Sequence, residues 1–333
     1  SGMHTKRTRM KARVNRWLLP LLVLGLLLSN WVSVSQANQE AGELGIPPVW
    51  PEQETSDEQP GDVLVYLPLV FRPPAPPPWV DTQSREASQA FYLLEYLGSS
   101  NPDAGWTGDH DSCNAGETSE TFRAAVLRRI NYYRAMAGIP ALVGFNPTYT
   151  FKAQAAALMM SVNNRLSHTP DESWVCYTEE GDEAAGSSNL YLGVYGSSAI
   201  RGYVYDPGSG NYFVGHRRWV LFPQTQYMGT GDIPPQDGYA ASNALWVFDR
   251  DNMYDPRPET RDMFVAWPPP GYVPYQVVYP RWSFAYPKAD FSQASVSMTR
   301  AGQPLALVQL AVVNGYGENT LVWEPQTSFG DPP

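Results

Sequence analysis

Two histidines are the side chains of this chain best suited to chemistry. The sequence contains four. His4 lies in a basic and apolar N-terminal stretch, and His110 lies in a loop rich in Gly and Asp. His168 and His216 remain as candidate bases or metal ligands. Two neutral imidazoles can bind Zn²⁺, but a zinc site normally has three or four protein ligands, and hydrolysis also needs a carboxylate base. Zinc at His168 and His216 therefore requires a nearby acid.

Other chemistries are less well supported. Residues 208–210 (Gly-Ser-Gly) and 196–198 (Gly-Ser-Ser) have turn compositions, and no G-x-S-x-G sequence is present, so a Ser-His mechanism is not expected. Asp109, His110 and Asp111 could ligate a cation, but charged residues in such a loop are usually solvated. We expect this cluster to be solvated and to hold no ion.

Two amphipathic helices are predicted to carry the candidate residues. Ser119 is a good N-cap and Gly138 a good C-terminal residue, so the first helix is expected over 120–137. Its spacing predicts a buried stripe of Phe122, Val126, Ile130, Tyr133 and Ala137 and a polar face with Arg123, Arg128 and Arg134. A second helix is predicted over 147–166, with small side chains that permit close approach of a partner: Ala153, Ala156, Ala157 and Met160. His168 follows its end, where capping of the last carbonyls is one role for it.

Three segments in matching order carry a resemblance to a known family. The pattern N-x-x-R-x-x-x-G-x-P ends the first helix at 131–140, and Ser-His-Thr ends the second at 167–169. The pattern G-H-R-x-x-x-[IVL]-x-P at 215–223 then leads to a G-x-G strand at 229–231. Over about residues 119–250 the chain resembles a CAP domain of the bacterial type, from the superfamily of cysteine-rich secretory and plant pathogenesis-related proteins.

The resemblance implies an α+β fold built as an α-β-α sandwich, with residues 245–248 as its closing strand. It also implies a cleft in which His168 and His216 face each other. In most members a G-E-N-[IL] sequence follows the first histidine and supplies an acid to this cleft.

The family's acid is replaced in this chain. Residues 186–190 read Gly-Ser-Ser-Asn-Leu, which puts Ser188 or Ser187 at the position of the Glu and Asn189 after it. Glu183 or Asp206 could substitute in space. We therefore assign Ser188 and Asn189 to the cleft, together with the two histidines.

Past about residue 225 the pattern changes to short alternating runs separated by turns. The runs are 244–249, 275–284, 294–299, 305–313 and 320–323. We expect a CAP-like domain over 85–255 and a small all-β module over 256–333, Ig-like or a partial sandwich. Four or five strands are fewer than the roughly seven of a complete sandwich. Either the chain is truncated at Pro333, or the module packs on the first domain. Its aromatic residues are expected in cores and edges.

The N-terminus predicts export. Residues 1–37 hold six basic residues and no acid, an apolar run at 17–28 and a small-x-small cleavage site at 35–37, all typical of a signal peptide. The run is shorter than the ~20 residues that span a membrane, so cleavage is favoured over an uncleaved anchor. Residues 38–84 are rich in Pro and acids and predict a disordered spacer, which would also suit a surface-tethered domain.

Charge limits the partners. Removing residues 1–37 takes away six of 23 basic residues and none of 33 acidic ones, which lowers the formal net charge from −10 to −16. An acidic chain without a basic stripe is not expected to bind nucleic acid. Anionic membrane surfaces are disfavoured too. We therefore expect membrane contact only through an uncleaved N-terminal segment.

The two cysteines, Cys113 and Cys176, are expected to form one disulfide. An even number in an exported chain favours a bridge, although two cysteines are too few for a disulfide-rich scaffold. Neither lies beside a basic cluster that would activate a thiol, so a catalytic cysteine is not expected.

Three functions remain open. The first is a secreted or surface-tethered, non-enzymatic module that binds a small apolar ligand, an envelope component or a partner protein. The second is a metal-dependent, protease-like hydrolase that uses His168 and His216 with zinc. The third is a purely structural envelope or adhesion protein, which would bind no ligand and form a large assembly.

Overall fold

The computed structural model describes residues 79–100, 102–236 and 238–327, which belong to one compact unit. The predicted signal peptide (1–37) and most of the predicted spacer (38–84) lie outside the described residues. None of the helices in the described ranges is long and apolar enough to cross a membrane.

A four-stranded sheet forms the centre of the N-terminal part of the described chain. In spatial order its strands are β1 (Gly144–Phe145), β3 (Tyr227–Ile233), β4 (Ser242–Trp246) and β2 (Ser188–Leu192). β1 runs parallel to β3, and the other neighbours are antiparallel. Every residue of β4 is buried, so both faces of the sheet must be covered.

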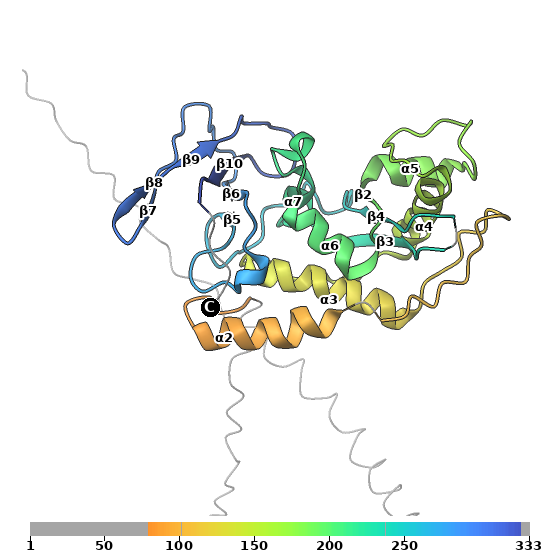
Figure 1. Ribbon diagram of the computed structural model, residues 1–333, viewed down its shortest axis with the longest axis horizontal. Helices are drawn as coiled ribbons and strands as arrows, with labels where there is room; N and C mark the ends of the chain where they lie inside the picture. Colours follow the sequence, from red (N-terminus) through yellow and green to blue (C-terminus); the bar gives the residue numbers. More distant parts are fainter. Residues whose placement is uncertain (1–78, 101, 237, 328–333) are drawn as a thin grey trace, which may run out of the picture. The chain divides into compact units, whose positions relative to one another are not determined.

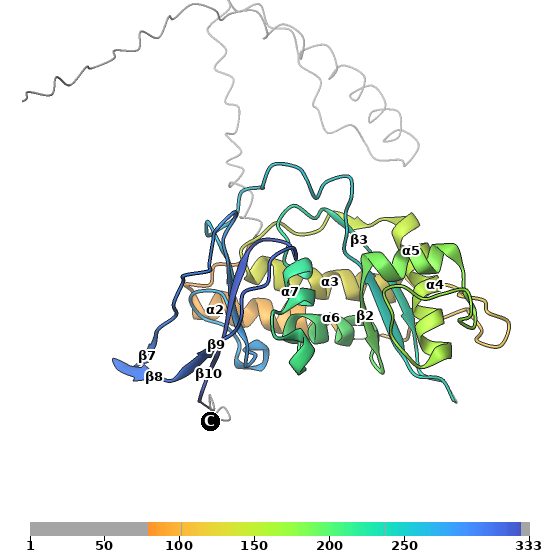
Figure 2. The ribbon, with the colours of Figure 1, turned by 90° about the horizontal axis from the view of Figure 1, so that it is seen from above.

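Helices provide this cover in two layers. α4 (Pro147–Asn163) packs on β3 and β4 and against α5 (Glu179–Ser187). On the other side α3 (Glu120–Met136) packs against α6 (Gly196–Tyr205), and α7 (Gly215–Val220) packs on α6. Figures 1 and 2 show the sheet between these two helical layers. The α+β class and the α-β-α sandwich are therefore confirmed.

The central strand β4 divides its side chains between two hydrophobic cores. Ala244 and Trp246 pack with the apolar residues of α4 and α5. Leu245, which points to the opposite face as the alternation of a strand requires, packs with α3 and α6. Of the predicted closing strand at 245–248, Leu245 and Trp246 thus lie in β4, which begins earlier, at Ser242, and ends before residues 247–248.

α4 lies unusually close to the sheet. A Cβ atom at Gly229 would overlap the backbone of Tyr149, and one at Gly231 would overlap the backbone of Ala153. Ala153, Ala156 and Ala157 are all fully buried at this contact. The G-x-G pattern of β3 and the small face of α4 therefore serve one purpose, which is close approach of helix and sheet.

α3 begins at its predicted N-cap, where Ser119 Oγ accepts a hydrogen bond from the Phe122 amide. The prediction that Arg134 lies on a polar face of this helix is wrong, because the Arg134 side chain is fully buried. Its guanidinium donates to the carbonyls of Val220, Phe222 and Thr225 at 2.9–3.1 Å. Burial lowers the pKa of Arg134 to about 9. Arg134, the arginine of the N-x-x-R pattern, therefore binds the loop that follows α7, where the G-H-R pattern ends.

A further helix precedes these elements and packs along α3 (Figure 1). α2 (Arg85–Phe91) is capped by Ser84, whose hydroxyl accepts from the Ala87 amide, and helical turns continue it to Ser99. Arg128 of α3 pairs with Glu95 in these turns at 2.6 Å.

The C-terminal part contains two small antiparallel sheets. One has the order β5 (Val265–Trp267), β6 (Trp282–Ala285), β10 (Thr320–Pro325) and β9 (Leu307–Gln309), and the other pairs β7 (Met298–Arg300) with β8 (Gln303–Leu305). The expected run at 275–284 becomes strand only from Trp282, since Tyr275–Val277 form a helical turn.

This C-terminal module packs on the helical part. Trp267 is fully buried, with its ring centroid 5.1 Å from that of Tyr133 on α3. The hydroxyls of Tyr133 and Tyr279 lie 2.7 Å apart, and burial raises the pKa of Tyr133 well above its usual value. The short module therefore packs on the first domain.

Candidate functional site

His168 and His216 line one surface groove. Two pockets of about 330 and 320 Å³ both have His168, Asn211 and His216 in their walls, so they are two lobes of one cavity, here called the histidine groove. The first lobe also includes Tyr191 and Tyr203. Cavities of this size suit small molecules.

His168 is held by α5 rather than by α4. Its Nδ1 lies 2.8 Å from the carbonyl oxygen of Ala185, in the last turn of α5. The expected role as a cap is therefore present, but on a different helix, because α4 already ends at Asn164 in a left-handed conformation. Since a carbonyl only accepts, Nδ1 of His168 carries the proton, and Nε2 of the neutral ring is an acceptor.

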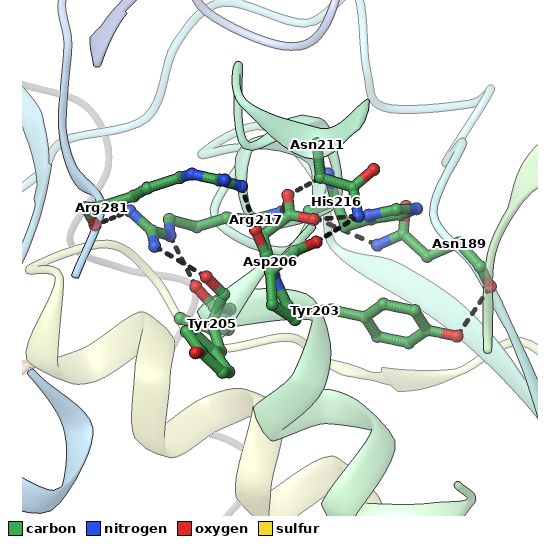
Figure 3. A network of polar contacts seen from close by, with 10 residues as sticks. Asn189, Tyr203, Tyr205, Asp206, Asn211, His216, Arg217 and Arg281 are labelled. Carbon is green, nitrogen blue, oxygen red and sulfur yellow. Dashed lines mark hydrogen bonds and ion pairs between the residues drawn. The ribbon is translucent and has the colours of Figure 1, made fainter. Parts of the chain in front are cut away.

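His216 is held by Asp206, one of the two acids considered as substitutes for the family's Glu. Nδ1 of His216 lies 2.8 Å from Asp206 Oδ1, while Oδ2 accepts from the amides of His216 and Arg217 at 3.0 and 3.3 Å (Figure 3). The Asp206 side chain is fully buried. A carboxylate at Nδ1 fixes the ring tautomer, so Nε2 of the neutral His216 is also an acceptor.

Ser188 and Asn189 begin β2 beside the groove, where the sequence predicts them. Asn189 donates from Nδ2 to the His216 carbonyl at 3.1 Å, and its own carbonyl accepts from the Tyr203 hydroxyl at 2.9 Å. The buried Ser188 hydroxyl makes no hydrogen bond within the described part of the chain, and Ser188 lines the second lobe. Its oxygen has almost no exposed surface, so it is a buried and unpaired hydroxyl beside the second lobe.

The other acid, Glu183, does not take part. It forms ion pairs with Lys152 and Arg250, on the outer side of α5. Across residues 79–100, 102–236 and 238–327, no three His, Cys, Asp or Glu side chains converge as a metal site would require. Because Asp206 is bound to His216, the donors present fit zinc poorly.

Two consecutive arginines lie beneath the groove. Arg217 is fully buried and donates to the carbonyls of Val204 and Arg281 and to the Ser283 hydroxyl. Burial lowers the pKa of both Arg217 and Arg218 to about 10. These links leave no local pattern in the sequence, because Arg281 and Ser283 belong to the C-terminal module, 64 and 66 residues away.

Aromatic side chains wall the second lobe. They are Phe213, Trp219, Phe248 and Tyr316. Tyr316 comes from the C-terminal module, and its ring centroid lies 4.7 Å from that of Phe213. Arg218 holds this segment by donating to the carbonyls of Val313 and Glu318 at 2.7 and 3.0 Å. The module therefore supplies part of the groove.

A buried polar chain lies behind the first lobe. The Tyr203 hydroxyl donates to the Asn243 side chain at 2.7 Å, and Asn243 donates to Asp232 at the same distance. Asp232 also accepts from the Thr230 hydroxyl and the Gly196 amide at 2.6 Å. Burial nevertheless raises its pKa. This chain positions Tyr203 in the wall of the groove.

The expectation of a solvated cluster at residues 109–111 is wrong for His110. This residue is 4% exposed, its ring stacks on Tyr239 at 4.0 Å, and its nitrogens lie 3.0 Å from Gln236 Oε1 and 3.1 Å from Ser161 Oγ. These partners are distant in sequence, so composition alone could not reveal them. His110 is thus a structural residue away from the groove.

The predicted disulfide between Cys113 and Cys176 is confirmed. It connects the loop before α3 to the segment between α4 and α5. No described residue of the histidine groove is a cysteine. The bridge therefore stabilises the fold and takes no direct part in the site.

Comparison with known proteins agrees with this architecture. Residues 127–249 match the family model described as CAP, the cysteine-rich secretory protein family. The matched segment includes both histidines and Asp206. No curated protein is a significant match to the chain.

Proposed function

From the premise that residues 127–249 are a CAP domain, we propose that the protein is an exported module whose histidine groove binds a small ligand without transforming it. The observation that carries the proposal is the engagement of both Nδ1 atoms, at Ala185 and Asp206. Two neutral imidazoles held in this way offer their Nε2 atoms as fixed hydrogen-bond acceptors.

The lining indicates the chemistry of the ligand. The aromatic wall of the second lobe suits an apolar face, while the two Nε2 atoms suit donors such as hydroxyl or amide groups. The buried Asp206 carboxylate next to His216 disfavours an anion. The ligand is therefore a neutral, largely apolar molecule with hydrogen-bond donors.

Binding is favoured over hydrolysis by the absence of an activated nucleophile. Within the described residues the Ser188 hydroxyl has no hydrogen bond to either imidazole. Such a bond is what would mark a histidine as its general base, so a Ser-His nucleophile is not supported. A zinc hydrolase would in addition need ligands that the groove does not offer.

Export is supported independently of the groove. Residues 1–37 have the pattern of a signal peptide, a disulfide is present, and the CAP family is mainly extracellular. Expression of the full chain in a host that exports proteins should place it outside the cytoplasm, with an intact mass that shows cleavage after Ala37. A full-length product retained in the cytoplasm would contradict export.

The binding proposal is tested on the exported protein by native mass spectrometry and elemental analysis. We expect a small-molecule adduct that His216→Ala abolishes and Tyr254→Ala retains, since Tyr254 is 86% exposed. We expect zinc far below one ion per chain. Stoichiometric zinc that is lost in both His168→Ala and His216→Ala, together with metal-dependent cleavage of casein, would replace the proposal with the hydrolase. A large assembly without an adduct on size exclusion would favour the structural role.

A further inference from the structure

Asp206 holds His216 from an unusual backbone position. It is the C-terminal cap of α6 and has a φ of 53°, in the left-handed region that residues other than Gly enter at a cost. Its carboxylate reaches His216 because of this conformation. A contact with the Asp206 backbone is therefore needed to stabilise this left-handed conformation.

Arg281 of the C-terminal module makes that contact. Its Nη1 donates to the Asp206 carbonyl at 2.8 Å (Figure 3). Its Nε pairs with Glu324 Oε1 at 2.8 Å. The Arg281 side chain is 14% exposed. The guanidinium therefore joins a backbone carbonyl of the helical part to a carboxylate of the module.

The pairing of β6 with β10 determines which residue lies beside Arg281. In the antiparallel pair of β6 and β10, Trp282 lies opposite Trp323, so Arg281 and Glu324 are the next residues along each strand and lie side by side. Charged partners that are adjacent across strands restrict each other's rotamers. Glu324 thus fixes the direction of the Arg281 side chain.

A second link joins the same two regions. The Arg217 guanidinium donates to the Arg281 carbonyl at 2.9 Å and to the Ser283 hydroxyl at 3.0 Å. Arg217 follows His216 directly in the chain. The segment from Arg281 into β6 is therefore attached to both Asp206 and the residue after His216.

We infer that Arg281 is a positioning residue of the histidine groove, which keeps Asp206 in its left-handed conformation and thereby fixes the Nδ1-protonated tautomer of His216. The C-terminal module is then part of the ligand site through Arg281 and Tyr316. This inference rests on the proposed function only in calling the groove a ligand site. The geometry of Asp206 and His216 can be tested without a ligand.

The test compares ring-nitrogen spectra of the full-length exported protein labelled with ¹⁵N-histidine, at a pH where the imidazoles are neutral. His216→Gln identifies the His216 signals. In the wild type we expect Nδ1 of His216 to carry the proton. In Arg281→Gln we expect a shift to the tautomer mixture of a free imidazole. Arg281→Lys retains one donor and should restore the wild-type pattern in part.

Arg261→Gln is the matched control. Arg261 also joins the module to the helical part, by donating to the carbonyls of Val80 and Met136 at 3.0 and 3.1 Å, but it does not line the groove. It should leave the His216 signals unchanged. An unchanged tautomer in a folded Arg281→Gln, or an equal change in both variants, would overturn the inference.

Binding of N-phenyl-1-naphthylamine, a neutral and apolar dye with one N–H donor, to the same variants separates the two proposals. If the wild type binds the dye, we expect Arg281→Gln to weaken binding several-fold and Arg261→Gln to leave it unchanged. Equal dye affinity in Arg281→Gln and the wild type would count against the module's part in the ligand site. A tautomer shift in Arg281→Gln with no dye or ligand bound by the wild type would support the positioning role and contradict the binding function.

Discussion

Nδ1 of His216 lies 2.8 Å from Oδ1 of Asp206, whose side chain is fully buried. The same carboxylate accepts hydrogen bonds from the backbone amides of His216 and Arg217, in the first turn of α7. Asp206 therefore sets both the tautomer of the ring and the start of the helix that carries it.

Replacement of Asp206 tests this relationship. Asn tolerates the left-handed conformation, so Asp206→Asn should preserve the backbone but lose the charge that accepts three hydrogen bonds. We expect a loss of about 1–3 kcal/mol in the free energy of unfolding, measured with urea. Asp206→Ala should cost more, because it also removes the acceptor. Equal stability of Asp206→Asn and the wild type would show that the carboxylate does not anchor α7.

The buried Arg134 should be among the most sensitive positions of the fold. Arg134→Met leaves at least three buried carbonyls without their donor, which we expect to cost about 3 kcal/mol or more. Arg128→Met is the control on the same helix, because its partly exposed pair with Glu95 contributes about 0–1 kcal/mol. Similar unfolding midpoints for the two variants would contradict this role.

Asp232 predicts a pH dependence of stability. Burial raises its pKa in the folded protein above the ordinary aspartate value of 3.8, so the folded state binds more protons than the unfolded state as the pH rises past 3.8. Its contribution is fully present below that value and is lost as the pH rises through the folded-state pKa. Relative to Asp232→Asn, the wild type should therefore lose stability as the pH rises above about 4. A constant difference, or one of opposite sign, would contradict this assignment.

The disulfide should contribute through the unfolded chain. Exported protein unfolded without reductant should have no free thiol, and two thiols would contradict the bridge. The double variant Cys113→Ser, Cys176→Ser should lose about 3–4 kcal/mol of stability, since the bridge closes a long loop. The wild type measured with reductant should match the double variant.

If the C-terminal module contributes to ligand binding, replacing Tyr316 in the wall of the groove should weaken it. Tyr316→Ala should weaken N-phenyl-1-naphthylamine binding about two- to tenfold, because an aromatic contact contributes about 0.5–1.5 kcal/mol. Tyr254→Ala removes an aromatic ring that is 86% exposed and outside the groove, and should have no effect. An equal loss in both variants would point to dye binding elsewhere on the surface.

Local patterns in the sequence predict much of this molecule. The resemblance of three short motifs to the CAP family implies the sandwich and the groove residues His168 and His216. Apolar spacing and caps predict α3 and α4, and the paired cysteines predict the bridge. These features depend on residues that are neighbours along a helix or strand, or on one covalent bond.

The tertiary structure decided which groups complete the site. Of the two acids considered, Asp206 contacts His216 while Glu183 pairs elsewhere, and this choice depends on the left-handed end of α6. Arg281 and Tyr316 reach the groove from strands and loops far along the chain. The sequence determined the histidines and the fold that presents them. Their tautomers, the role of Asp206 and the contribution of the module arise only from packing, because such contacts join residues whose separation in sequence carries no local pattern.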